Sequence, residues 1–360
     1  MRFIPQTKFG DFSLGFMLIC HIKLFIFPYL DKISLAYLFI EPLPNGNILM
    51  LVWGSKTRAK ALNAGIKPEN VGRGPVMFDK IIEVEPVGRH GGNIVWEWNL
   101  WDHLIQDHDS NKQNYGVVAE NPQLIDINSK GKKVMIEKNL FFTIEKTDFS
   151  HFNSLDYNPE LDQIMVGSRY LNEIYIIDHS TTTQEAKTHS GGNSGKGGDI
   201  LYRWGNPLNY HAGKKSDQQL YAQHDAQWIN PGLQGEGNIL IFDNGWGRED
   251  ELFSTVIELI PPTEYGNYIL EPGSAYGPVK PFWNYTAKNK ADFYSGMMSG
   301  AQRLPDGNTL ICSGVQCKFF TVTPEKEIVW EYTNNFPKLD SFLNYVYKTQ
   351  YYPSDYPGIK

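Results

Sequence analysis

The chain has 360 residues, and 41% of them are hydrophobic, enough to bury a large core in one all-β domain or in two smaller domains. Its 33 lysine and arginine residues are outnumbered by 40 aspartate and glutamate residues, for a formal net charge of −7. This balance excludes the strongly basic footprint of a nucleic-acid-binding protein, and we expect no nucleic-acid partner.

Residues 1–36 differ in pattern from the rest of the chain. Two short apolar runs, at residues 14–20 and 24–30, are separated by His21 and Lys23. A membrane-spanning helix needs about 20 apolar residues, and a secretory signal needs a small-residue cleavage site after its apolar run. Neither pattern is met, so we treat residues 1–36 as an atypical segment. A decayed signal, a mis-assigned start and a buried strand pair all stay open.

From residue 38 onward, a pattern of strand, turn and second strand repeats. Its four copies are LFIEPLPNGNILML from Leu38, HFNSLDYNPELDQIMV from His151, HDAQWINPGLQGEGNILIF from His224 and SGAQRLPDGNTLIC from Ser299. A phrase rich in Trp and Ile follows three of them: GGNIVWEWN at 91–99, GDILYRWGNP at 198–207 and EKEIVWEYTN at 325–334. Short strands with Asn, Gly, Asp and Pro turns predict an all-β fold, and their repetition favours a β-propeller.

The spacing of the copies exceeds the about 40 to 50 residues of an ordinary propeller blade, so we expect long loops and insertions. Two helical insertions are predicted, at residues 56–64, ended by Gly65, and at residues 100–107. The glycine-rich stretch 188–199 is predicted to be a flexible loop. Gly197 stands where a phosphate-binding loop needs Ser or Thr after Lys196. We assign residues 37–340 to the propeller and residues 341–360 to a C-terminal tail.

The cysteine and histidine spacing gives no sign of a structural metal, and we expect no cofactor. Cys20, Cys312 and Cys317 are too few for a disulfide framework. Cys312 and Cys317 either form a bridge or stay as free thiols, and we favour free thiols. His103 and Asp107 are spaced as neighbours on a helix, but without a third ligand we favour a solvated helix face over a metal site.

The repeats also predict a site. Equivalent positions of successive blades point toward one central channel, so His151 and His224 should face each other there. The hairpin turn after His151 is centred on Glu160, which places Arg169 opposite His151. Asn153 lies two residues along the strand from His151 and is expected on the same face as a further donor.

Two histidines and an arginine suit the transfer of a charged tetrahedral group. A neutral imidazole at His224 can act as the nucleophile, while the guanidinium of Arg169 neutralises the oxygens of the group in flight. A lone strand histidine is more often a core or surface residue, and Arg169 alone is more often a surface cation. Asp225 is expected to be a turn residue or a hydrogen-bond partner that links blades.

The phrases HDAQWINPGLQGEGNILIFDNG, DYNPELDQI, NEIYIIDHSTTTQEA, GGDILYRWGNP and SGAQRLPDGNTLICSG together resemble the bacterial arylsulfotransferase family, over residues 41–334. The resemblance implies a six-bladed propeller that exchanges a sulfuryl group by a ping-pong mechanism, without a nucleotide sulfate donor. The implied partners are a phenolic sulfate donor and a phenol acceptor. His224 matches the histidine that becomes sulfurylated, and His151 and Arg169 match residues that hold the sulfuryl oxygens. The resemblance also implies export to the periplasm or cell surface.

Two departures from the family pattern support an alternative hypothesis. The resemblance leads us to expect a histidine just before EPLPNGN, where this chain has Leu38, and four copies are visible instead of six. A degenerate propeller that binds partners or aromatic ligands without chemistry is the alternative. A quinone-dependent dehydrogenase is a weaker third hypothesis, because it would need calcium-ligating carboxylates in the channel. A homodimer stays open.

Overall fold

The computed structural model describes residues 4–8, 34–89, 91–129, 133–138, 143–264, 266–334 and 345–353; for residues 4–8, 34–38, 133–138 and 143–145 it describes the backbone alone. The chain folds into two compact units. The larger unit consists of residues 23–220 and 262–277, and the smaller unit consists of residues 1–22, 221–261 and 278–360.

The larger unit contains two four-stranded antiparallel meanders. The first has the strands β2 (Ser34–Pro42), β3 (Ile48–Lys56), β4 (Val76–Val87) and β5 (Gly91–Asn99). The second has the strands β10 (Phe152–Asn158), β11 (Gln163–Ser168), β12 (Glu173–Asp178) and β13 (Ile200–Trp204). The hairpin of β8 (Lys133–Lys138) and β9 (Thr143–Asp148) extends the first sheet, because β9 pairs in parallel with the start of β4. The described part of this unit also contains two small pairs: β6 (Leu104–Ile105) with β7 (Ile125–Asp126), and β17 (Thr263–Glu264) with β18 (Asn267–Tyr268).

The smaller unit contains two more meanders of the same kind. The third has the strands β14 (His224–Trp228), β15 (Ile239–Asp243), β16 (Thr255–Leu259) and β19 (Trp283–Tyr285). The fourth has the strands β20 (Gly300–Arg303), β21 (Thr309–Ser313), β22 (Lys318–Val322) and β23 (Ile328–Thr333). The strands β1 (Ile4–Lys8) and β24 (Val346–Gln350) form an antiparallel pair.

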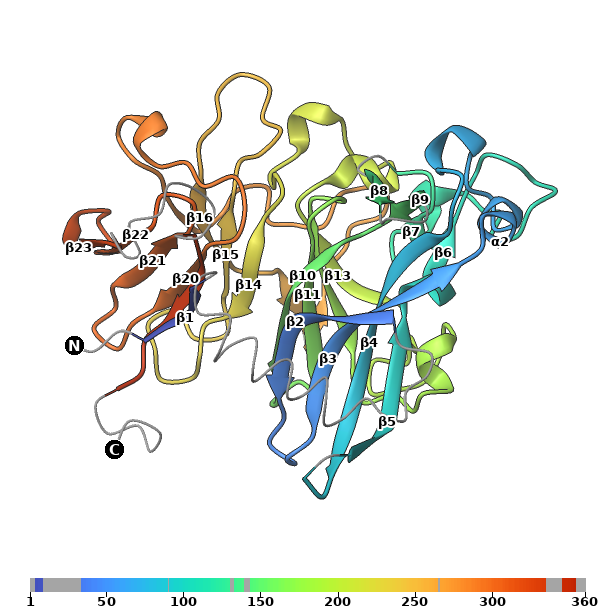
Figure 1. Ribbon diagram of the computed structural model, residues 1–360, viewed down its shortest axis with the longest axis horizontal. Coiled ribbons are helices and arrows are strands. Elements are labelled where there is room, and N and C mark those ends of the chain that lie inside the picture. The colour runs from blue at the N-terminus through green and yellow to red at the C-terminus, as the bar shows by residue number, and fades with distance from the viewer. Residues whose placement is uncertain are drawn as a thin grey trace. The chain divides into compact units, whose positions relative to one another are not determined.

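A four-stranded antiparallel meander is the blade of a β-propeller, and the described residues contain four of them (Figure 1). The fold is therefore all-β and of the propeller type, as the sequence predicts. Each of the four predicted strand-turn-strand copies forms the first hairpin of a blade. The Trp- and Ile-rich phrases form β5, β13 and β23, the fourth strand of their blades.

The same turn closes the first hairpin of the first and fourth blades. Gly46 has φ +87° and Gly307 has φ +84°, a left-handed conformation that glycine adopts without steric cost. The main-chain hydrogen bonds also match: Gly46 N–H donates to the Leu43 carbonyl, and Gly307 N–H donates to that of Leu304. The PNGN and PDGN sequences therefore determine the turns locally.

Within each unit, apolar side chains from neighbouring blades pack together in a buried cluster. In the larger unit, Leu49 and Ile81 of the first blade and Ile164 of the second belong to one buried cluster. In the smaller unit, Phe242 of the third blade and Phe320 of the fourth share another. The strands β11, β12, β15, β16 and β21 are buried along their whole length, which explains their nearly continuous apolar sequences.

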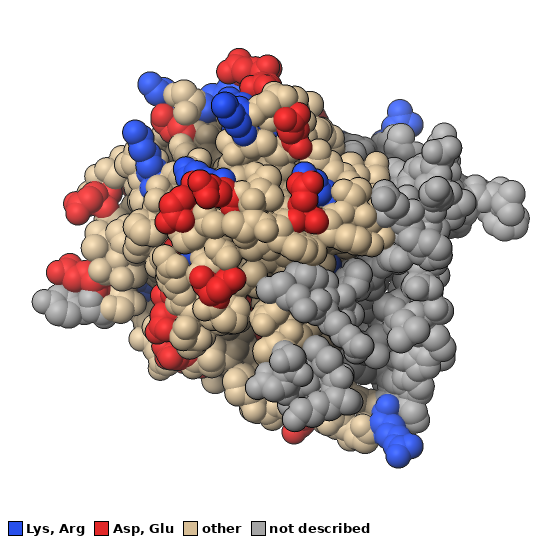
Figure 2. Space-filling model, turned by 90° about the vertical axis from the view of Figure 1, so that its left-hand side faces the viewer, with Lys and Arg blue, Asp and Glu red and all other residues tan. Residues whose placement is uncertain are grey.

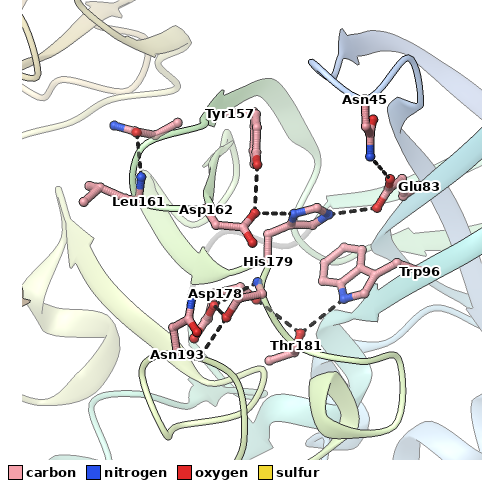
Figure 3. Close-up of polar contacts among 12 residues, drawn as sticks. Asn45, Glu83, Trp96, Tyr157, Leu161, Asp162, Asp178, His179, Thr181 and Asn193 are labelled. Atoms are coloured by element: carbon pink, nitrogen blue, oxygen red, sulfur yellow. Dashed lines mark hydrogen bonds and ion pairs between the residues drawn. The ribbon is translucent and has the colours of Figure 1, made fainter.

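A polar network around His179, just after β12, ties the first two blades together (Figure 3). Its Nδ1 lies 2.7 Å from Asp162 Oδ1, and its Nε2 lies 3.0 Å from Glu83 Oε2 on β4. Tyr157 donates to the same Asp162 oxygen at 2.8 Å, and the Trp96 ring packs edge-on against His179 at 4.9 Å. Both ring nitrogens therefore face carboxylate oxygens, and His179 bridges the first two blades.

One of the two predicted helical insertions is confirmed. The helix α2 (Arg58–Asn63) begins after Thr57, whose side chain accepts from Lys60 N–H, and Gly65 follows it with φ +95°. The other prediction is wrong. Residues 100–107 form the 3₁₀ turn η2 (Leu100–His103) and then β6, because Leu104 and Ile105 pair with β7 instead of continuing a helix.

The other helical segments within the described residues are single 3₁₀ turns. They are η1 (Pro68–Asn70), η3 (Val118–Glu120), η4 (Glu185–Lys187), η5 (Pro207–Tyr210), η6 (Lys215–Asp217) and η7 (Lys290–Asp292). Within the described residues, no helix has the length and apolar character needed to span a membrane.

Candidate active site

His224 is the first residue of β14 and is almost fully buried, with 6% of its surface exposed. Its Nδ1 lies 2.7 Å from Asn244 Oδ1 and 3.2 Å from the Ala222 carbonyl oxygen. The Asn244 Nδ2 donates to the carbonyls of Ser295 and Met298, which sets the orientation of the amide. Since both neighbours of Nδ1 are acceptors, Nδ1 carries the proton. The lone pair of the neutral ring is therefore on Nε2.

Asp225, next to His224, confirms the predicted role of a hydrogen-bond partner that links blades. It adopts a left-handed φ of 54°, and its carboxylate accepts from the Ala301 N–H of β20 at 3.1 Å and from Lys348 Nζ at 3.1 Å. A Cβ on Gly300 would come within 2.1 Å of Asp225 Oδ2. Glycine at position 300 is therefore required for the third and fourth blades to approach this closely.

His151 directly precedes β10, with φ 51°, and its Nδ1 lies 2.6 Å from Asp148 Oδ2. The Arg169 N–H donates to the His151 carbonyl at 3.1 Å, which confirms that these residues lie opposite each other. A β-bulge between Phe152 and Ser154 shifts the register there. The buried Asn153 lies inside this bulge, so the strict alternation behind its predicted placement is interrupted.

Tyr170 is a further candidate that the sequence did not single out by position. The Tyr170 ring centroid lies 4.8 Å from the His151 ring centroid and 5.7 Å from the Arg169 guanidinium carbon. Burial, helped by the negative charge of Asp148, raises the pKa of Tyr170 to about 12, so its hydroxyl stays protonated at neutral pH. Its one sequence signal is its position directly after Arg169.

Asp79, on β4, contacts the segment that leads to His151. Its Oδ2 accepts from Ser150 Oγ at 2.5 Å and from Phe152 N–H at 3.0 Å, so it holds the segment that carries His151. Burial, and then the neighbouring charge of Asp148, raises the pKa of Asp79 to about 7.

The predicted site residues are divided between the two units. His151, Arg169 and Asn153 belong to the larger unit and His224 to the smaller. The convergence of the two histidines therefore stays a prediction. The backbone of Leu38 lies within β2, and its side chain is outside the described part.

The cysteines and the surface add two observations. Cys312 and Cys317 are both free thiols, as favoured from the sequence, and burial raises the pKa of Cys312 to about 12. Figure 2 shows acidic and basic side chains interspersed among uncharged ones on the face that it displays.

Comparison with known proteins agrees with the sequence phrases. The family model "Arylsulfotransferase (ASST)" matches residues 39–352. The arylsulfate sulfotransferase AssT of Lelliottia amnigena is 26% identical over 247 residues, covering 64% of this chain and 38% of that protein. The AssT of Escherichia coli O6:H1 is 25% identical over 294 residues, covering 78% of this chain and 45% of that protein. The chain thus spans less than half the length of these two curated relatives.

Solved structures show only distant likenesses. A virginiamycin B lyase from Staphylococcus aureus, crystallised with quinupristin, is 14% identical, with a TM-score of 0.33, over 87% of this chain and 73% of that one. A protein from Lactobacillus plantarum is 10% identical, with a TM-score of 0.35, over 82% of this chain and 70% of that one. These likenesses carry no argument about function. The family match extends over most of the sequence and all four blades, so the chain belongs to the arylsulfotransferase family.

Proposed function

We propose that this protein transfers a sulfuryl group from a phenolic sulfate ester to a phenol, without a nucleotide sulfate donor. The family match and the names of the two curated relatives support the reaction class. By family resemblance, we also propose that the protein works in the periplasm or at the cell surface.

In the first half-reaction, His224 Nε2 attacks the sulfur of the aryl sulfate. The ester S–O bond breaks as the N–S bond forms, and the electron pair leaves with the phenoxide. In the second half-reaction, an acceptor phenol loses its proton, its oxygen attacks the same sulfur, and the N–S electron pair returns to the imidazole. The hydrogen bond from Nδ1 to Asn244 supports this role, because it keeps the attacking lone pair on Nε2.

Arg169, His151 and Tyr170 are proposed to serve the transferred group and the leaving phenoxide. The guanidinium of Arg169 would neutralise the sulfuryl oxygens as charge develops in the transition state. His151, oriented by Asp148, or the protonated hydroxyl of Tyr170 would give a proton to the phenoxide and take one from the acceptor. Asn153 is proposed as an additional donor toward the substrate.

The observation that carries the proposal is the burial of His224 together with the 2.7 Å contact between its Nδ1 and the Asn244 side-chain oxygen. The test uses 4-nitrophenyl sulfate as donor and phenol as acceptor, with release of nitrophenol as the readout. His224→Ala should abolish release. His211→Ala, at a histidine whose side chain is 43% exposed, should leave release at the wild-type rate. Equal rates for wild type and His224→Ala would overturn the proposal.

One observation favours a second candidate function. Leu38 stands where the family resemblance leads us to expect a histidine, and a leucine side chain can neither donate a hydrogen bond nor carry charge. A propeller that binds phenolic ligands without turnover is the corresponding candidate. If calorimetry shows that the protein binds a phenol while it releases no nitrophenol, this second candidate is supported. If Leu38→His then releases nitrophenol, the leucine at position 38 is the cause of the lost sulfuryl transfer.

A further inference from the structure

His103, His189 and Asp199 form a cluster within the larger unit. His103 is the last residue of η2, His189 lies in the loop after η4, and Asp199 directly precedes β13. Asp199 Oδ1 lies 3.0 Å from His103 Nδ1 and 2.8 Å from His189 Nδ1, and one ligand atom from each residue lies within 4.8 Å of the other two. We propose that these three side chains bind a divalent transition-metal ion of the zinc class.

The hydrogen bonding of His103 favours a cation at this place. Its Nε2 lies 2.9 Å from the Ala186 carbonyl oxygen, which can only accept, so Nε2 carries a proton. Nδ1 is then the ring nitrogen available to a metal ion, and it faces the carboxylate of Asp199. A histidine N–H bonded to a main-chain carbonyl is the usual outer partner of a metal-bound imidazole.

The surroundings hold this imidazole in one orientation. The ring of Trp98 stacks on His103 with 5.3 Å between centroids and 3° between planes, and its Nε1 donates to the Gly198 carbonyl at 2.7 Å. A Cβ on Gly198 would come within 2.1 Å of the Ala186 oxygen and 2.7 Å of His103 Nε2. Glycine is therefore needed where the loop passes the buried histidine.

The ligand set and its exposure fit zinc. Zinc takes imidazole nitrogens and carboxylate oxygens at about 2.0 to 2.2 Å, often with three protein ligands and one position for solvent. Such bonds separate neighbouring ligand atoms by roughly 3.3 Å, so the distances of 3.0 Å and 2.8 Å from Asp199 Oδ1 to the two histidine nitrogens need to open only slightly. His103 is fully buried, but 62% of the His189 side chain is exposed, which provides access from solvent.

The structure corrects the sequence interpretation of His103. The sequence pairs His103 with Asp107 on a solvated helix face, whereas His103 is fully buried and faces Asp199 across 96 positions of sequence. The loop between residues 188 and 199, predicted to be flexible, has main-chain hydrogen bonds from Gly197 to Gly191 and from Gly198 to Thr188.

The test measures metal uptake by the full chain after removal of any purification tag. Protein stripped with a chelator is titrated with zinc chloride by calorimetry, and cobalt chloride is used in parallel to detect the visible absorption of a low-symmetry site. Wild type should bind one zinc ion, and His189→Ala should bind it on the order of 100-fold more weakly. His211→Ala, which removes an exposed histidine near Asp107, is the matched control and should bind like wild type.

Zinc should also raise the thermal unfolding midpoint of wild type and of His211→Ala more than that of His189→Ala. Equal zinc affinity in wild type and His189→Ala would overturn the site, as would a wild type that takes up no zinc. These readouts do not depend on sulfuryl transfer, so the outcome is separate from that of the proposed function.

Discussion

Asp79 and Asp243 are buried carboxyl groups whose environments disfavour their charged forms. Burial raises the pKa of Asp79 to about 7 and that of Asp243 to about 6. An unfolded aspartate has a pKa near 3.9. Between the unfolded and the folded pKa, each of these carboxyls binds more protons in the folded state than in the unfolded state. The stability that each protonated carboxyl contributes is therefore complete below about pH 4 and is lost as the pH rises through the folded pKa.

Asp79→Asn should therefore flatten the pH dependence of stability. Asparagine keeps an oxygen that accepts from Ser150 Oγ and Phe152 N–H, and it has no charge to desolvate. We expect the wild-type free energy of unfolding to fall more than that of the variant between pH 5 and pH 8, measured by urea denaturation. Asp306→Asn, at an exposed turn, is the control and should follow wild type. Parallel curves for wild type and Asp79→Asn would contradict the assignment.

At the scale of elements, neighbouring blades are joined by single polar side chains as well as by apolar cores. In the larger unit, Asp79 on β4 accepts from Phe152 N–H at the start of β10. In the smaller unit, Asp225 on β14 accepts from Ala301 N–H on β20. Each carboxylate accepts a hydrogen bond from a main-chain N–H of the next blade, so these contacts help to set how closely two blades approach.

Asp225→Ala should destabilise the protein by about 2 kcal/mol, because it leaves the buried Ala301 N–H without an acceptor. The loss should appear as a lower midpoint in chemical denaturation. Asp292→Ala, which removes an exposed carboxylate that accepts from Asn289, should cost less than half as much. If both variants lose the same stability, the hydrogen bond between Asp225 and Ala301 does not contribute significantly to the free energy of unfolding.

At the scale of the whole molecule, the proposed chemistry draws on both compact units. Arg169 and His151 come from the larger unit, and the proposed nucleophile His224 comes from the smaller. A guanidinium stabilises a transferred sulfuryl group only if it reaches the oxygens of that group. The rate of His224 sulfurylation in an Arg169 variant therefore tests whether Arg169 acts on the group bound to His224.

Arg169→Ala should slow the sulfurylation of His224 by 100-fold or more, the size of effect expected when one charged donor to the transition state is removed. Rapid mixing with 4-nitrophenyl sulfate, followed by mass analysis of the peptide that contains His224, gives the rate. Arg89→Ala, at an exposed arginine of the same unit, is the control and should load at the wild-type rate. Unchanged loading in Arg169→Ala would contradict the proposed role of Arg169.

The sequence by itself determined the blades, because their signals are local. Alternating apolar residues and the PNGN and PDGN turns define hairpins through contacts between residues close in the chain, and the turn at Glu160 placed Arg169 opposite His151. The repeat also placed His224 at the start of a first strand, where the structure has it. For His151 the alignment was displaced by one residue, since β10 begins at Phe152.

Only the tertiary structure decided the partners of the buried polar groups. Asn244 beside His224, Tyr170 beside His151, and Asp199 between His103 and His189 could not be predicted from spacing. Residues 100–107 likewise have a helix-like pattern, yet pairing with β7 makes Leu104 and Ile105 a strand. The physical reason is the same in each case: a buried donor or acceptor is satisfied by whichever group the fold brings within reach, and local sequence does not specify that group.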